Sequence, residues 1–354
     1  MQGVHLNIVV DCYHPANFLI LKNPMRQLAT EGHDVFWCIR KKDVLEDLVR
    51  GENLPYSLLT RPRPGILGRA IELVEHDYKV FREIIRRKAR LAIGASISVA
   101  HAARLVPGTD SIVFNDDDAE VVKPFVKLGY PFADWIVTPE CLREDHGPHH
   151  VTHNSYHVLS YLHPNHFKAA DNILNELGVD PNQRLFLLRF VSLSAFHDTH
   201  AVGLSFDNKL RLISYLKQHG RVLISCEGEY PRDFASMIFK ADPVKMHSIL
   251  AHCDLVVGDS QTMTAEAAVL GIPSVRCNTF VGKISYLDEL EKTYGLTFGY
   301  QPDRFDEVFK KIESLVQTVN IKGIWQEKRE KMLRDKEDLA DWIYRFIKEK
   351  YLPQ

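Results

Sequence analysis

The chain has 354 residues, of which 45% are hydrophobic and 25% are charged, and its formal net charge is −2. This length and composition are typical of a globular protein with two domains. The small net charge argues against a nucleic-acid-binding protein, and no apolar run is long enough to cross a membrane. The N-terminus lacks the basic start of a signal peptide, so we expect a cytoplasmic protein.

Strand-like and helical patterns alternate along the first half of the chain. The expected strands are 6–10, 34–39, 56–59, 91–94, 111–114 and 135–137, and the expected helices are 17–30, 44–50, 68–88 and 119–128. Short apolar strands separated by amphipathic helices indicate βαβ units, and therefore a parallel sheet that is covered by helices on both faces.

A second series of the same kind follows the His- and Pro-rich stretch 140–166, which we predict to be a linker. Its expected strands are 185–191, 221–226, 255–257 and 274–277, its expected helices are 208–219, 245–252 and 262–270, and the segments 287–294, 296–299 and 304–316 complete it. We therefore predict two Rossmann-like domains, 1–160 and 161–323. In the remaining segment, 324–354, a long charged helix at 325–350 is placed to pack back on the first domain.

Two such domains that face each other form a central cleft at the carboxyl ends of their sheets, where α/β proteins bind ligands. Polar turns follow strands at 11–15, 94–96, 115–118, 192–200, 227–229 and 259–262. We expect the chemistry to reside in these turns.

The turn at 259–262 is the most informative of them. Ser260 and Thr262 are both able to cap the helix that follows, and the free N–H groups of a helix N-terminus bind anions. Glu266 lies one turn further along the same helical face, where a carboxylate can accept bonds from sugar hydroxyls. This pattern suits a nucleoside diphosphate, although an ordinary capped helix would have the same sequence.

Three further residues are candidates for substrate binding. Arg189 ends an apolar strand and could pair with a diphosphate, or with a nearby acid on the surface. Glu227 follows the strand 221–226 and could meet a hydroxyl or a base, and Gly228 beside it permits close backbone approach.

Candidates for a catalytic base lie in two turns of the first domain. His14 close to Asp11 could take a proton from a sugar hydroxyl, but an N-capping Asp11 with a structural His14 is slightly favoured. Asp117 could supply the base instead. For the run 116–118, however, we favour a simple match of acids to the dipole of helix 119–128.

Two other groups of charged side chains have simpler explanations. The linker histidines 146, 149, 150, 153 and 157 lack the spacing of a zinc site, and no two cysteines form a C-x-x-C pair, so we expect solvated histidines and no metal. The basic end of helix 68–88 is expected to be solvated, while Ile84, Ile85 and Leu91 leave peripheral membrane contact open.

Several of these segments together resemble a known family. They are Asp11 to Pro15, Thr138 to Cys141, Tyr161 to Asn165, Leu188 to Ser192, Ser225 to Glu229 and Gly258 to Ala268. They are similar to an uncharacterised prokaryotic family of the GT-B glycosyltransferase superfamily, which is akin to UDP-N-acetylglucosamine 2-epimerases. The resemblance extends to about residue 320 and implies two facing Rossmann-like domains, with the nucleotide sugar held mainly by the second.

The resemblance also implies roles for particular residues. Ser260 and the backbone at Gln261 and Thr262 would bind the phosphates, and Glu266 the ribose. Met263 beside them is a further candidate for substrate binding. The related epimerases have glycines at the positions of Gln261 and Thr262, which weighs against epimerase activity here.

We therefore expect a glycosyltransferase of the GT-B type that works without a cofactor or a metal ion. Its donor would be a UDP-sugar and its acceptor a glycan or a lipid-linked sugar, in the synthesis of surface polysaccharide or glycolipid. A UDP-N-acetylglucosamine 2-epimerase and a non-catalytic nucleotide-sugar-binding protein remain the alternatives.

Overall fold

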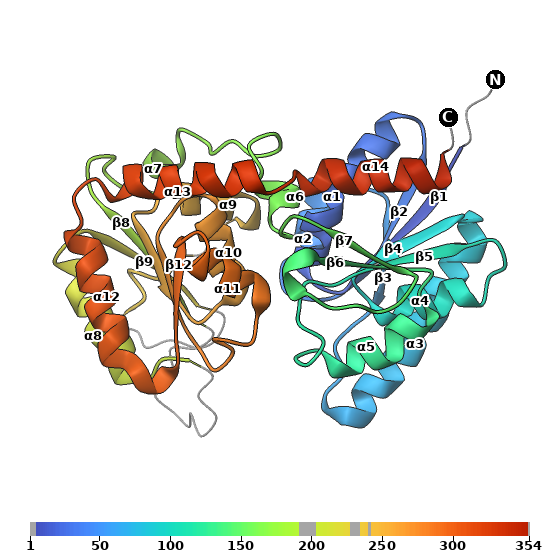
Figure 1. Cartoon of the computed structure of the whole chain (residues 1–354), viewed down its shortest axis with the longest axis horizontal. Helices are drawn as coiled ribbons and strands as arrows, with labels where there is room; N and C mark the ends of the chain where they lie inside the picture. Colours follow the sequence, from blue (N-terminus) through green and yellow to red (C-terminus); the bar gives the residue numbers. More distant parts are fainter. Residues whose placement is uncertain (1–4, 191–202, 227–233, 240–241, 353–354) are drawn as a thin grey trace. The chain divides into compact units, whose positions relative to one another are not determined.

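The computed structural model describes residues 5–190, 203–226, 234–239 and 242–352. These residues form two compact units, one of residues 1–166 with 336–354 and one of residues 167–335. Each unit is built on a single parallel sheet with helices packed against it (Figure 1). The predicted α/β class with two parallel sheets is therefore confirmed.

Unit 1 contains a seven-stranded sheet in the order β3-β2-β1-β4-β5-β6-β7. Its strands are β1 (Asn7–Cys12), β2 (Asp34–Arg40), β3 (Tyr56–Thr60), β4 (Leu91–Gly94), β5 (Asp110–Phe114), β6 (Trp135–Pro139) and β7 (His150–His153). Its main helices are α1 (Pro15–Thr30), α2 (Leu45–Gly51), α3 (Gly65–Arg87), α4 (Ile97–Arg104), α5 (Lys123–Gly129), α6 (Leu159–Leu162) and α14 (Leu339–Tyr351). Strand β1 lies centrally and is buried because it pairs in parallel with both β2 and β4.

Side-chain alternation along β1 distributes its residues between two cores. Val9 joins a cluster that includes Val80 and Ile84 of α3 and Val99 of α4. Its neighbours Ile8 and Val10 point to the opposite face of the sheet, as the two-residue period of a strand requires. Apolar residues on both faces of the strand explain why its sequence is an uninterrupted apolar run.

Unit 2 contains a five-stranded sheet in the order β12-β11-β10-β8-β9. Its strands are β8 (Leu185–Phe190), β9 (Arg221–Cys226), β10 (Leu255–Gly258), β11 (Ser274–Cys277) and β12 (Thr297–Tyr300). The helices are α7 (Ile173–Glu176), α8 (Phe206–Lys217), α9 (Met246–His252), α10 (Gln261–Val269), α11 (Ser285–Lys292), α12 (Phe305–Gln317) and α13 (Ile321–Asp335). In the described part of the chain, no helix is both long and apolar enough to cross a membrane.

The stretch 140–166 is not a plain linker. It contains β7, which pairs in parallel with β6, and the short helix α6, which packs on α1. The first boundary between the units therefore falls after His166 instead of after residue 160. Sequence patterns missed β7 because its four residues, His-Val-Thr-His, contain only one apolar side chain.

The C-terminal helix expected at 325–350 is two helices. Helix α13 belongs to unit 2, whereas α14 belongs to unit 1, where it lies along α1 and also contacts α6 (Figure 1). The break occurs because the Asp338 carboxylate accepts bonds from the backbone N–H groups of Ala340 and Asp341 and so caps α14. The charged sequence 325–350 does not show this break, since it has no proline or glycine.

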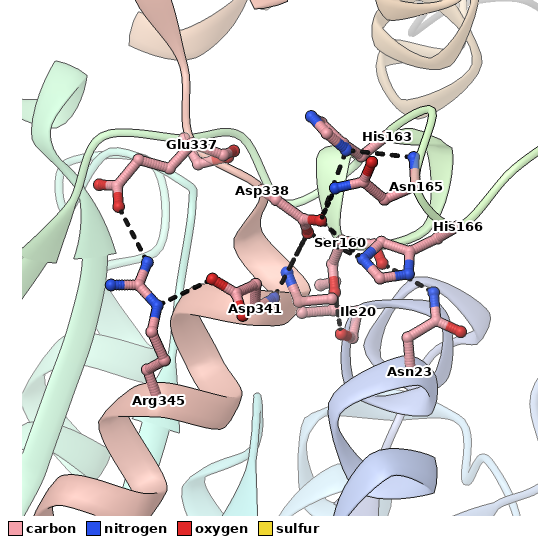
Figure 2. A network of polar contacts seen from close by, with 12 residues as sticks. Ile20, Asn23, Ser160, His163, Asn165, His166, Glu337, Asp338, Asp341 and Arg345 are labelled. Carbon is pink, nitrogen blue, oxygen red and sulfur yellow. Dashed lines mark hydrogen bonds and ion pairs between the residues drawn. The ribbon is translucent and has the colours of Figure 1, made fainter.

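Asp338 also joins two distant segments of unit 1, as Figure 2 shows. Its oxygens lie 2.9 Å from Asn165 Nδ2 and 2.9 Å from His166 Nε2, and His163 Nδ1 is 3.4 Å away. Burial raises the pKa of this carboxyl, but the hydrogen bonds from His166 and Asn165 outweigh it and bring the pKa to about 2. The chain leaves unit 1 after His166 and returns to it at Lys336. The Asp338 contacts therefore tie these two ends together within unit 1.

We predict that Asp338→Asn lowers the free energy of unfolding of unit 1 at pH 7 by roughly 1–2 kcal/mol. A carboxyl with a depressed pKa stabilises the folded state above its unfolded pKa of about 3.9, and this contribution is lost as the pH falls through about 2. Denaturant unfolding across this pH range measures the effect.

Asp341→Asn is the matched control, because Asp341 lies in the same helix turn but pairs with Arg345 on the surface (Figure 2). It should change stability little. An equal loss in the two variants, or a loss in Asp338→Asn that persists unchanged at pH 2, would contradict the account.

Candidate functional site

The turn between β10 and α10 in unit 2 leads directly into the N-terminus of α10, a largely buried helix. Gly258 ends β10, and Ser260 is the N-cap, with its side chain accepting a bond from Met263 N at 3.3 Å. The helix begins at Gln261, so Thr262 lies in its first turn and does not cap it. No acidic residue occupies that first turn. A helix N-terminus without acids in its first turn suits an anion, because the positive end of the helix dipole lies there.

Neighbouring strand ends hold this turn in place. Asp259 N donates to the Arg189 carbonyl at 3.1 Å, and Asn278 Nδ2 donates to the Asp259 carbonyl at 2.9 Å. Arg189, the last residue but one of β8, pairs in register with Gly258, and its guanidinium donates to Ser225 Oγ of β9 at 2.7 Å. The structure thus brings Arg189 to the same sheet edge as Ser260.

Glu266 is mostly buried and has a partner that the sequence did not indicate. Its Oε1 lies 3.0 Å from His247 Nε2, on the neighbouring helix α9, and the His247 ring packs edge-on against Phe167. The pairing fixes the direction of the carboxylate. No spacing in the sequence relates residues 247 and 266, because they meet only through the packing of α9 on α10.

The substrate-binding candidates Glu227 and Gly228, and the segment 192–200 that we expected to be a polar turn, lie outside the described residues.

In unit 1 the structure separates Asp11 from His14. Asp11 is fully buried, with Oδ1 2.9 Å from His76 Nε2, while Ser96 Oγ donates to its Oδ2. His14, not Asp11, caps α1, by accepting a bond from Ala16 N. The idea of an N-capping Asp11 was therefore wrong, since the Asp11 side chain points into the core.

His76 continues the polar contacts around Asp11. Its Nδ1 lies 2.7 Å from Thr60 Oγ1, and its ring packs against Tyr13 at 4.4 Å between centroids. Both His76 and Asp11 have no exposed side-chain surface. A buried polar pair with every hydrogen bond made is a structural element of the sheet edge.

The acidic run 116–118 is not the N-terminus of a helix. Helix α5 begins only at Lys123, so the dipole interpretation was wrong. The run is instead a loop at the carboxyl end of β5, held by Asn115, whose Nδ2 donates to the Asp117 carbonyl at 2.6 Å. Burial, together with the neighbouring Asp116, raises the pKa of Asp117 to about 7. A carboxyl with this pKa can accept or donate a proton near neutral pH.

We had expected the linker histidines to be solvated, but the structure shows that they are not uniformly so. His153 and His157 are buried, His150 bonds Thr138 Oγ1 at 2.7 Å, and His146 bonds Glu144. Of the five, His149 alone is exposed. Within the described ranges, no three His, Cys, Asp or Glu side chains are grouped so that they could hold a metal ion.

Arg276 in β11 is a further buried polar residue that sequence analysis missed. It is fully buried, and its three guanidinium nitrogens make no hydrogen bond within the structure. Burial lowers the pKa of Arg276, while Tyr286 and Glu291 act in the opposite direction.

Several solved structures are similar to nearly the whole chain. The spinosyn forosaminyltransferase SpnP has 14% identity and a TM-score of 0.63, covering 98% of this chain and 99% of its own. A protein assigned as a UDP-N-acetylglucosamine 2-epimerase from Listeria monocytogenes has 13% identity and a TM-score of 0.68, covering 98% and 97%. The spinosyn rhamnosyltransferase SpnG, complexed with thymidine diphosphate, has 12% identity and a TM-score of 0.59, covering 96% and 100%.

At these identities the similarity establishes the fold, which is that of the GT-B glycosyltransferases. No curated protein sequence matches the chain. The model of one protein family matches residues 6–350, nearly the full length. The chain therefore belongs to the family described as "Protein of unknown function (DUF354)".

Proposed function

We propose that the protein is a glycosyltransferase that takes a sugar from a nucleoside diphosphate, with UDP as the first candidate, and transfers it to a glycan or lipid-linked acceptor. Surface polysaccharide or glycolipid synthesis is the process that would use it. The observation that carries the proposal is the N-terminus of α10 directly after β10, with Ser260 at its cap and Glu266 one turn beyond Thr262. The likeness to SpnG supports it, since one structure of that transferase holds thymidine diphosphate and another holds the spinosyn aglycone.

In the proposed reaction, the acceptor hydroxyl oxygen forms a bond to the anomeric carbon of the sugar. The bond from that carbon to the diphosphate oxygen breaks, and its electron pair leaves with the diphosphate. The first-turn N–H groups of α10 would stabilise the charge on the leaving group. Arg189 would add a cation beside it, and Glu266 would bind the ribose hydroxyls.

The hydroxyl proton needs a base, for which unit 1 offers His14 and Asp117. Asp11 ranks behind them, because it is fully buried and already bonded to His76 and Ser96. The pKa of about 7 favours Asp117. His14 and Asp117 can be replaced one at a time. The variant that has lost the base should turn over more slowly and should bind the donor with little change in affinity.

For donor binding, Glu266→Ala should weaken the affinity for UDP by about 1–3 kcal/mol, because a charged hydrogen bond to the ribose is lost. Glu307→Ala is the matched control, since Glu307 is a half-exposed carboxylate of the same unit, paired with Arg304. Calorimetric titration with UDP measures the difference. Equal affinity of the wild type and Glu266→Ala would remove Glu266 from the donor site.

We further propose that unit 1 contacts an anionic lipid bilayer through α3. Leu67, Ile71, Val74, Tyr78 and Ile85 lie on one face of this helix, and each is 46–75% exposed. Ile84 and Leu91, which we had considered as membrane contacts, are instead fully buried in the core. An exposed apolar stripe of this kind on a helix is typical of a binding surface.

Charge complementarity points to an anionic lipid surface as the partner. The segment 61–90 carries nine Lys and Arg residues and four Asp and Glu residues, and the arginines at 61, 63, 69, 82 and 86 are exposed. Basic side chains that flank an apolar helix face favour anionic headgroups. A lipid-linked acceptor would be reached from such a surface.

Flotation with vesicles of phosphatidylglycerol and phosphatidylcholine tests this contact. The wild type should bind the anionic vesicles, and the double variant Leu67→Ser, Val74→Ser should lose most of that binding. Leu105→Ser with Val319→Ser is the control, because these apolar side chains are 69% and 86% exposed elsewhere. Equal binding by both double variants would refute the contact. The contact would also be refuted if the wild type proved to be a dimer and the Leu67→Ser, Val74→Ser variant a monomer, because the α3 stripe would then bind a second copy of the chain.

A further inference from the structure

A cluster of buried titratable side chains lies behind the acidic loop of unit 1. The His157 side chain is 4% exposed, and its Nδ1 lies 3.2 Å from Asp116 Oδ1. His153 stacks on His157 with 5.9 Å between ring centroids and an interplanar angle of 26°. Both His153 nitrogens and His157 Nε2 are buried without a hydrogen-bond partner in the structure. Three unpartnered imidazole nitrogens are costly in a core and call for an explanation beyond packing.

The surroundings of His153 decide its charge. Burial lowers the pKa of His153 well below its ordinary value, with His157 and Lys336 acting in the same direction, so its ring is neutral at physiological pH. This neutral ring stacks on one face of the His157 imidazole. The buried His157 ring meets the Asp116 carboxylate, whose side chain is about one-third exposed.

We infer that His157 and Asp116 are positioning residues that determine whether Asp117 holds a proton when the acceptor arrives. The Nδ1 contact keeps Asp116 in one orientation beside Asp117, whose backbone is fixed by Asn115. The inference rests on the proposed function for its catalytic meaning, but the electrostatic arrangement can be tested without a substrate.

The charges around Asp117 shift its pKa in opposite directions. Burial has the largest effect and raises its pKa, Asp116 and Asp118 raise it further, and His157 lowers it. Other titratable groups in or beside the cluster are Tyr130, which bonds Asn115, together with Glu144, His153 and Lys336. Replacing Asp116 and replacing His157 should therefore move the Asp117 titration in opposite directions.

A carbon-13 NMR titration of the aspartate carboxyl groups in the full-length protein tests this arrangement, with Asp117 assigned from the signal lost in Asp117→Asn. Asp116→Asn should lower the Asp117 midpoint by about one pH unit, because a neighbouring anion is removed. His157→Asn should raise it by a similar amount, about one unit, because the amide keeps a donor toward Asp116 but cannot carry charge.

His101→Asn is the matched control, since His101 forms another histidine–carboxylate pair of unit 1, at 2.7 Å from Asp77. It should leave the Asp117 midpoint in place. A wild-type Asp117 midpoint in the ordinary range near 4, or a midpoint that His157→Asn leaves unmoved, would overturn the inference. Asp116 is about one-third exposed, so its variant provides a second measurement should His157→Asn not fold.

The same variants separate this inference from the proposed function. Once a donor and an acceptor are found, the acid limb of the rate profile should move with the NMR midpoint in each variant. An NMR midpoint that moves while the rate profile stays would show that Asp117 is not the base. If no sugar nucleotide is turned over at all, the proposed function fails, whereas the NMR titration still decides the role of His157.

Discussion

The proposed donor site depends on the close approach of two strand ends in unit 2. Gly258 of β10 lies in register with Arg189 of β8, and a Cβ atom at Gly258 would lie 2.1 Å from the Arg189 carbonyl oxygen. Only glycine allows β10 to come this close before the chain turns into α10. The turn, the Ser260 cap and the direction of the helix N-terminus all follow from that contact, so any larger residue at 258 would displace the proposed phosphate site.

Unit 1 shows the same construction at a second strand end. A Cβ atom at Gly94 would lie 2.3 Å from the Asp11 carbonyl oxygen, and Ser96 just beyond it both caps α4 and bonds the Asp11 side chain. The carboxyl edge of this sheet is thereby filled around β1 by the buried groups Asp11, His76 and Ser96. Partly exposed acids of the same sheet edge lie after β5, and Asp117, which we proposed as a base, is one of them.

The sequence predicted the fold well where periodicity is strong. The apolar strand 255–257 with the Ala-rich helix after it was placed to within one or two residues, because both lie in the buried centre of unit 2. It failed where long-range packing decides the outcome. The four-residue strand β7, the break at Asp338 and the pairing of His247 with Glu266 each depend on partners far away in the chain.

In the candidate site, too, the sequence predicted the local features and missed those that depend on long-range packing. A helix cap such as Ser260 is a local feature and could be read from the sequence, whereas the surroundings of Asp117 could not. The Asp117 pKa depends on burial and on charges that reach it from two segments. Helix 119–128 was expected four residues too early, and that error alone led us to explain the acids by a helix dipole.

The central claim is sugar transfer rather than epimerisation, and incubation with UDP-N-acetylglucosamine in heavy water tests it most directly. Both kinds of enzyme would hold the nucleotide, but an epimerase that inverts C2 removes and returns the C2 proton, which exchanges with solvent. The account predicts no deuterium at C2, and UDP release only when an acceptor is present. Deuterium that appears at C2 with the protein and the sugar nucleotide alone would contradict it.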